Sequence, residues 1–414
     1  MTLRDESRTN GHPETPPTFT QEIKNDPWAF FSDLRENHPV ARLRHPDGFD
    51  FFAITRYDLV RDGLSDLRFS QNFDTLAESS VLALEREDPL APLNKNLLGI
   101  DPPDHTRLRR LATPAFHRQK VEQLHETAAK TVTSLLAALP PDEPVDLIEQ
   151  FATKVPATVL SELFDIDVDD WADFRRRGQL LMTPPWGQTH ADVAVIKMPM
   201  LDYCVDLVRR RRKNPGEDII SSMVQARDGS DKLSEDELVG MTFLILMTSY
   251  QTTYAFLTNA VLALLERPDA LKTVLRNKTV QGPILEELLR FAGPVETAPI
   301  RFATEQVEIE GRIIPAKAPV SLLVSAANRD EKVFHDPHDL VFDRRDNPHL
   351  SFGHGIHFCL GTVLAKLEAI TALDGLLKAR PGLTLAADPG SLVQRPGIIL
   401  RVPTELPVLL GPAA

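Results

Sequence analysis

A segment without charged side chains is the feature that most constrains how this chain folds. Residues 238–265 contain no Asp, Glu, Lys or Arg. Ser234 and Glu237, just before the segment, match the S-x-x-E capping box that begins many helices, and no proline follows until Pro268. This pattern predicts one helix of roughly 48 Å, at 1.5 Å per residue. Because a helix that is apolar on all sides must be buried, we expect it to cross the centre of the protein.

The same segment is long enough to span a bilayer, so a membrane helix is the alternative interpretation. Its centre holds hydroxyl and amide side chains, which are costly in lipid: Thr248, Ser249, Gln251, Thr252 and Thr253. The first residues lack the basic start and the apolar run of a signal peptide. The sequence therefore favours a soluble, cytoplasmic protein without a membrane partner.

Composition narrows the classes of function. The formal net charge of −13 disfavours nonspecific binding to nucleic acid or to anionic membranes. The two cysteines, Cys204 and Cys359, cannot form a disulfide framework and suit a reducing compartment. With 414 residues, the chain is long enough to bury a large core.

Helical patterns dominate the chain, and a smaller β portion comes from both ends. We expect helices over residues 27–37, 56–66, 106–139, 144–183, 190–213, 281–291 and 361–379. Strand-like runs cover residues 39–55 (a hairpin), 307–315, 318–328 and 398–410. Residues 70–104 form a long, poorly periodic segment, of the kind that often carries function. Residues 1–24 are polar and proline-rich and predict a disordered tail before a single, mainly α domain of residues 25–414.

The segment "SFGHGIHFCLG", residues 351–361, is called the cysteine loop below. Gly353, Gly355 and Gly361 surround Cys359, which indicates tight turns or a close approach to another group. A helix follows directly, and a thiolate gains stability near a helix N-terminus. The arrangement suits a soft metal ligand or a nucleophile, but also a small buried thiol in a turn. The neighbouring histidines do not complete a tetrahedral zinc site.

The cysteine loop resembles the haem-binding signature of the cytochrome P450 family. The residues that fit F-x-x-G-x-[RH]-x-C-x-G are Phe352, Gly355, His357, Cys359 and Gly361. Further motifs in the family's order are E-x-x-R, at Glu287 and Arg290, and H-x-x-x-R, at His105 and Arg109. The resemblance covers about residues 25–410. It implies the P450 fold, a triangular prism with haem between a long distal helix and the helix that follows the proximal cysteine loop.

This resemblance also implies roles for the cofactor-binding residues. Cys359 would be the axial thiolate ligand of the iron in haem b (iron protoporphyrin IX), and O2 the co-substrate. Phe352, Gly353 and Gly361 would shape the loop around the sulfur. The groups that would hold the two propionates are His105, Arg109, Arg301 and His357. The family's structural ion-pair triad would consist of Glu287, Arg290 and Arg344.

The polar centre of the long segment corresponds to the family's distal pattern [AG]-G-x-[DE]-T. Aligning on the threonine places Ser249 at the glycine and Gln251 at the acid. Thr252 keeps the alcohol of the acid–alcohol pair that delivers protons, whereas a neutral Gln251 could only orient water there. Both are the predicted catalytic positions. We expect altered proton delivery, which could favour oxidative coupling or ring closure over hydroxylation.

The resemblance implies a largely apolar small-molecule substrate, of the kind met in secondary metabolism. The predicted substrate contacts are Leu97, Trp186, Leu244, Thr248, Val295, Thr297, Ala298 and Ile398. Electrons would come from NAD(P)H through a ferredoxin reductase and a ferredoxin, which would dock on a proximal basic cluster of Arg107, Arg110, Arg118, Lys120 and Lys366. We expect a monomer. A haem-binding ligand sensor with little turnover and a helical binding protein without haem are the alternatives.

Overall fold

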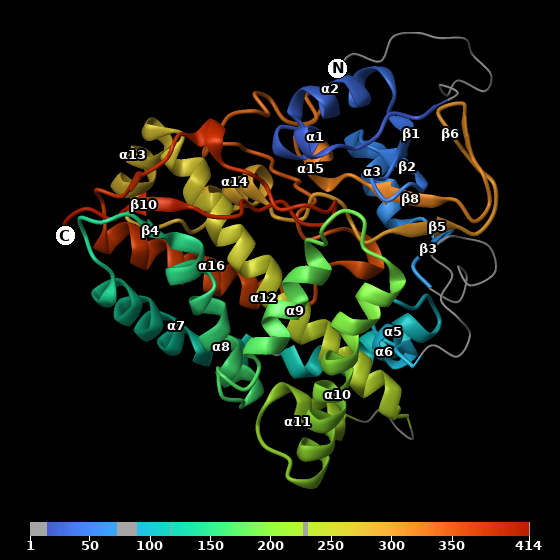
Figure 1. Ribbon diagram of the computed structural model, residues 1–414, viewed down its shortest axis with the longest axis horizontal. Helices are drawn as coiled ribbons and strands as arrows, with labels where there is room; N and C mark the ends of the chain where they lie inside the picture. Colours follow the sequence, from blue (N-terminus) through green and yellow to red (C-terminus); the bar gives the residue numbers. More distant parts are fainter. Residues whose placement is uncertain (1–14, 73–88, 117, 227–230, 414) are drawn as a thin grey trace.

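The charge-free segment forms a single buried helix through the middle of the protein. The structure, a computed structural model, describes residues 15–72, 89–116, 118–226 and 231–413. Helix α12 (Glu235–Leu265) begins with the predicted capping box, in which Ser234 and Glu237 exchange side-chain and backbone hydrogen bonds. It runs diagonally through the centre of Figure 1. Among the described residues, no helix has the length and apolar character needed to cross a membrane.

Other helices surround α12 on the helical side of the molecule (Figure 1). They are α5 (Ala91–Asn94), α6 (Asp104–Ala112), α7 (Arg118–Ala138), α8 (Lys154–Phe164), α9 (Ala172–Met182), α10 (His190–Lys213), α11 (Ile219–Gln225), α13 (Pro268–Asn277), α14 (Pro283–Ala292) and α16 (Thr362–Ala379). The expected helix 106–139 is thus two helices, with a 3-10 turn at Thr113–Phe116 between them. Gly240 lets α5 lie directly on α12, because a Cβ there would stand 2.6 Å from the carbonyl oxygen of Lys95.

The β portion is small and joins both ends of the chain. Its main sheet has the order β1-β2-β8-β5-β3, and β2 and β8 are parallel. Its strands are β1 (Val40–Arg44), β2 (Asp50–Ile54), β3 (Phe69–Ser70), β5 (Arg301–Ala303) and β8 (Pro319–Leu322). The other strands form a pair, β6 (Val307–Ile309) with β7 (Arg312–Ile314), and a triplet, β4 (Val145–Asp146), β10 (Pro407–Leu409) and β9 (Thr384–Leu385). Close to the main sheet lie α2 (Trp28–Asn37), α3 (Tyr57–Ser65) and α15 (Val324–Ala327) (Figure 1).

The folded chain begins earlier than the expected boundary at residue 25. Helix α1 (Gln21–Asn25) lies within the range predicted to be a tail. Lys24 is fully buried, forms an ion pair with the equally buried Glu296, and donates to the Leu400 carbonyl over 2.9 Å. This contact could not be predicted from the sequence, because Glu296 and Leu400 lie far from Lys24 along the chain. Residues 1–14 of the predicted tail and 73–88 of the predicted loop lie outside the described residues.

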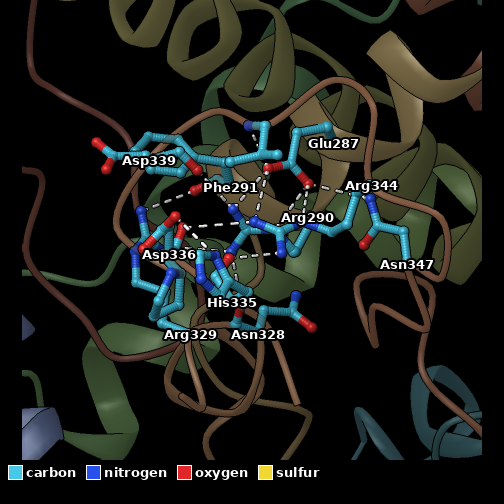
Figure 2. Close-up of polar contacts among 12 residues, drawn as sticks. Glu287, Arg290, Phe291, Asn328, Arg329, His335, Asp336, Asp339, Arg344 and Asn347 are labelled. Atoms are coloured by element: carbon cyan, nitrogen blue, oxygen red, sulfur yellow. Dashed lines mark hydrogen bonds and ion pairs between the residues drawn. The ribbon is translucent and has the colours of Figure 1, made fainter. Parts of the chain in front are cut away.

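The predicted ion-pair triad is present, and its central residue, Glu287, is fully buried. Its carboxylate accepts from Arg290 over 2.8 Å on both oxygens, from Arg344 Nε over 3.1 Å and from the Val341 N–H over 2.8 Å. Asn347 completes the set at 3.1 Å (Figure 2). Burial alone would raise the pKa of Glu287, but the two guanidiniums and the other donors hold it below its usual value.

Arg290 extends this network to the chain that leads into the cysteine loop. It donates to the carbonyl oxygens of Asn328, Pro337 and Asp339 over 2.8 to 2.9 Å (Figure 2). One buried pair on α14 therefore fixes an irregular segment of residues 328–347, whose backbone would otherwise lack partners.

We expect Glu287→Gln to lower the free energy of unfolding by about 3–5 kcal/mol, because it leaves two guanidiniums buried without an anion. Denaturant unfolding followed by circular dichroism measures the change. Glu126→Gln, which breaks the exposed pair of Glu126 with Lys130, is the control and should leave the midpoint nearly unchanged. An unaltered midpoint for Glu287→Gln would contradict this assignment.

Candidate functional site

A cavity lies between α12 and the cysteine loop. It is lined by every predicted cofactor-binding residue: His105, Arg109, Arg301, Phe352, Gly353, His357, Cys359 and Gly361. α12 forms one wall with Leu244, Thr248 and Thr252, and the start of α16 forms part of the other. Residues from α6, β5 and the cysteine loop, far apart in sequence, thus meet around one space.

The cysteine loop has a backbone that few sequences could adopt. Gly353 and Gly355 have φ angles of +74° and +71°, a region that favours glycine. A Cβ on Gly355 would stand 2.6 Å from the Ser65 hydroxyl. The Cys359 N–H donates to the Phe352 carbonyl over 2.9 Å, which closes the loop. The clustered glycines are therefore explained by strained φ angles and by a close approach to α3.

The sulfur of Cys359 lies in a buried environment with several donors. Burial raises the pKa of the Cys359 thiol, while the Gly361 N–H, the Thr362 hydroxyl and the charge of Arg109 act to lower it. Arg109 also donates to the loop carbonyls of Ile356 over 3.0 Å and Phe358 over 2.7 Å. The donors suit a thiolate whose charge is balanced by a bound metal cation.

The wall of the cavity also carries cationic and imidazole groups that form no ion pair with a carboxylate among the described residues. Within the described ranges, neither Arg109 nor Arg301 forms an ion pair with a carboxylate. Both ring nitrogens of the buried His105, and Nε of Arg301, lack any hydrogen-bond partner there. His357 Nδ1 donates to the Leu97 carbonyl over 3.1 Å, and the centre of its ring lies 4.4 Å from that of His105. These groups could bind an anion with several oxygens.

The pKa values of these groups follow from burial and crowding. Burial, with help from the nearby Arg301, lowers the pKa of His357 to about 3. Burial also lowers the pKa of Arg301 to about 10, so that its guanidinium stays charged at neutral pH. Two fixed positive charges thus face the cavity. The orphaned donors and the sulfur fit haem, which presents two carboxylates and an iron that accepts a thiolate.

On α12, two of the hydroxyls that line the cavity bond to the helix itself. Thr248 Oγ donates to the Leu244 carbonyl and Thr252 Oγ to the Thr248 carbonyl, each over 2.7 Å. Ser249 and Thr253 also line the cavity. Bonds of this type to the i−4 carbonyl satisfy a hydroxyl in an apolar helix and tend to bend it. They explain how α12 tolerates its polar centre.

Gln251 does not line the cavity. Its side-chain Nε2 donates to the Arg175 carbonyl over 2.9 Å, and it packs against Gly178 of α9. Position 251 is one residue from Thr252 and so points to a different side of α12, toward α9. The expectation that Gln251 orients water at the reaction centre is therefore not supported by its geometry.

The predicted substrate contacts divide into two groups. Leu97, Leu244, Thr248, Val295 and Ala298 line the cavity. Three others do not: Trp186, Thr297 and Ile398. Thr297 Oγ donates to the Ile398 carbonyl over 3.0 Å. These two residues therefore bond to each other next to the cavity and do not line it.

Trp186 anchors the connection between α9 and α10. Its Nε1 donates to the Gln21 side chain over 2.9 Å, and its ring lies edge-on to His45 at 5.5 Å. The neighbouring Gly187 N–H donates to Asp47 over 2.7 Å. Trp186 therefore lies outside the cavity, and an isolated aromatic in a loop gives no signal of which surface it packs on.

The polar lining residues that the sequence analysis did not assign to the site include Gln71 and Glu368. Glu368 is fully buried, and burial raises its pKa to about 8, with a hydrogen bond from Thr253 acting in the opposite direction. A single glutamate inside the apolar pattern of the helix 361–379 was an available signal, because buried acids are rare without a partner.

The predicted basic cluster is largely neutralised. Arg107 pairs with Glu237 and lies 3.5 Å from Asp231, which also pairs with Arg110. Lys366 Nζ lies 2.7 Å from Glu286. The side chains of Arg118 and Lys120 lie outside the described part of the structure. On the same side of the molecule as Cys359, the apolar Phe358 and Val363 are 44% and 46% exposed.

Comparison with known proteins shows similarity over nearly the whole chain. Residues 160–379 match the family model "Cytochrome P450". Cytochrome P450 107B1 of Saccharopolyspora erythraea is 36% identical, over 95% of this chain and 97% of that protein. The cytochrome P450 monooxygenase PikC of Streptomyces venezuelae is also 36% identical, over 94% and 92% respectively. Among solved structures, the tirandamycin C-bound P450 monooxygenase TamI is 34% identical with a TM-score of 0.85, over 96% of this chain and 100% of that one.

We expect Trp186→Ala to raise the rate of hydrogen exchange of residues 183–189 roughly tenfold, equivalent to about 1.4 kcal/mol of local stability. The anchor on Gln21 and His45 would be lost. Mass spectrometry of peptic peptides measures the change, and Val195→Ala, at an exposed position on α10, is the control. Unchanged exchange in Trp186→Ala would show that the ring does not hold this connection.

Proposed function

Because this chain belongs to the cytochrome P450 family, we propose that its cavity holds haem b with Cys359 as the axial ligand of the iron. The predicted mainly α fold is that of the family. The observation that carries the site assignment is the convergence on a single cavity of one buried sulfur, the guanidinium of Arg109, and the unpaired ring nitrogens of His105 and Nε of Arg301. When bound, haem with a thiolate ligand supplies the activation of O2.

The protein's own residues have separate tasks in this proposal. Arg109, Arg301, His105 and His357 hold the two propionates with charged or neutral donors. The Gly361 N–H stabilises the sulfur, and the Thr362 hydroxyl donates to the Cys359 carbonyl over 2.9 Å. Phe352, which also lines the cavity, excludes water from it.

On the opposite wall, Thr252 presents a hydroxyl beside the reacting centre. Because its hydrogen is donated to the Thr248 carbonyl, the oxygen remains able to accept a hydrogen bond, for example from a water.

The proposed reaction is oxidation of a largely apolar small molecule, either by hydroxylation or by oxidative coupling or ring closure. The apolar lining, with Leu97, Leu244, Val295 and Ala298, supports such a substrate. The relative TamI was solved with tirandamycin C, and PikC is named as a monooxygenase. By analogy, the substrate is a secondary metabolite. Gln251 at the acid position supports a proton route that differs from the family's usual one.

The proposed electron source is NAD(P)H, through a reductase and a ferredoxin, in the cytoplasm and with this chain as a monomer. Since Arg107, Arg110 and Lys366 are engaged with acids, we place the docking contact on the exposed Phe358 and Val363 beside Cys359. Apolar side chains at the centre of an interface commonly carry much of its binding energy.

The reduced holoprotein should show the red-shifted Soret band of a thiolate-bound haem under carbon monoxide, and Cys359→His should abolish it. Absorption spectroscopy measures this change. Cys204→Ala removes the other thiol, which lies buried on α10, and should keep the band. A haem-loaded wild type without the band would contradict the proposal, and material without any Soret band would favour the helical binding protein.

Turnover separates an enzyme from a ligand sensor. Compounds from a secondary-metabolite library that shift the haem spin state would be incubated with a surrogate ferredoxin, its reductase and NADPH. Oxidised products seen by mass spectrometry support the proposal, whereas tight binding without product supports the sensor.

Phe358→Ser should raise the KM for ferredoxin in haem reduction by about fivefold to tenfold, through loss of an apolar contact of about 1 kcal/mol or more. Stopped-flow spectroscopy measures the reduction. Reduction by dithionite, which needs no docking, should be unaffected. Val205→Ser, at a similarly exposed apolar position on α10, is the matched control. Equal KM values for both variants would place the docking surface elsewhere.

A further inference from the structure

Two short segments of chain, residues 294–298 and 398–401, are bonded to each other beside the cavity and are called the paired wall below. Val295 lines the cavity from the first segment and Ile399 from the second. The Glu296 N–H donates to the Ile399 carbonyl over 2.8 Å. Glu296 itself does not line the cavity, and its side chain extends to α1 instead. The paired wall therefore has one face toward the cavity and one contact with the first helix.

Lys24 on α1 bonds to both segments of the paired wall. Its Nζ forms an ion pair with Glu296 Oε2 and donates to the Leu400 carbonyl over 2.9 Å. In the opposite direction, the Arg401 guanidinium donates to the carbonyl oxygens of Lys24 and Asn25, the latter over 2.8 Å. The C-terminal end of α1 thus holds the two segments together.

The Glu296 carboxylate depends on Lys24 alone. Among the described residues its Oε2 accepts a hydrogen bond only from Lys24, and its Oε1 has no hydrogen-bond partner. The two side chains are 1% and 0% exposed respectively, so water does not take the place of a missing partner. One residue of α1 therefore fixes where this side chain of the paired wall lies.

Stability alone is a weak explanation for such a pair. Removing two charges from water offsets most of their attraction, and apolar side chains of similar volume often stabilise a protein as well or better. What the pair adds is direction, because an ammonium group bonds two oxygen atoms at once only at a defined spacing. No residue of α1 lines the cavity. The contacts of Lys24 are therefore suited to setting the shape of the wall and not to touching a ligand.

We propose that Lys24 is a positioning residue for the substrate. It acts through Glu296 and Leu400. Because these residues adjoin Val295 and Ile399, their place determines how large an apolar ligand the cavity accepts. Small ligands of the haem iron, which do not reach the paired wall, bind independently of Lys24. This inference rests on the proposed function, since its ligands are those of a haem protein.

Two azoles that bind haem iron test this role by their size. Clotrimazole carries three aryl rings and would contact the paired wall, whereas imidazole would not. The double variant Lys24→Met/Glu296→Leu loses the directional bonds without leaving an unpaired buried charge. It should raise the Kd of clotrimazole about tenfold, the effect of losing one aliphatic contact, and change the Kd of imidazole by no more than about twofold. Titration of the Soret shift of the ferric holoprotein measures both values.

A matched pair of variants at position 296 tests the hydrogen bond itself, and it serves equally if the double variant does not fold. Both Glu296→Gln and Glu296→Leu remove the charge, and burial already lowers the pKa of Lys24, so that its ammonium can lose a proton. Only Glu296→Gln keeps an acceptor for Lys24. It should bind clotrimazole within about twofold of the wild type, whereas Glu296→Leu should lose about tenfold. Lys130→Met, which breaks an exposed ion pair on α7, should change neither Kd.

Equal clotrimazole affinity in the wild type and the double variant would overturn the proposal, as would equal losses in the two variants of Glu296. A parallel loss of imidazole affinity would also overturn it, because the effect would then not depend on ligand size. The carbon monoxide band separates these failures from failure of the proposed function. All variants should keep the red-shifted band, because none of them touches the sulfur of Cys359. If the band is present and the selective loss is absent, only the role of Lys24 is wrong.

Discussion

The burial of α12 is the constraint on which the rest of the structure depends. The helix carries no charge from Leu238 to Leu265, so water is excluded along most of its length. Its hydroxyls are tolerated because Thr248 and Thr252 bond to carbonyls one turn earlier. The helix therefore provides both a rigid wall and a few polar atoms at one place. The helices α9, α14 and α16, each of which contributes a lining residue, pack against that wall.

The electrostatics of the cavity are asymmetric. Neither Arg109 nor Arg301 forms an ion pair with a carboxylate within the described residues, whereas burial raises the pKa of Glu368 to about 8. This distribution favours a ligand with negative charges at one edge and an apolar remainder.

Much of this arrangement could be predicted from the sequence, because the relevant signals are local. The capping box of α12, the glycines around Cys359 and the spacing of Glu287 and Arg290 each specify geometry within a few residues. The positions of Trp186 and Gln251 could not be predicted, because each depends on a surface contributed by distant residues. Glu368 was missed for a different reason: helical periodicity marks it as buried but does not say which space it faces.

The first helix has a consequence for any shortened version of this protein. Lys24 is the buried counter-ion of Glu296, and Glu296 directly follows Val295 in the cavity wall. Composition suggests residue 25 as the boundary of the domain. A chain that starts there lacks Lys24, and the buried carboxylate of Glu296 loses its ion-pair partner. The wall would then have to admit water or rearrange. Helix α1 thus stabilises a wall of the cavity, although none of its residues lines the cavity.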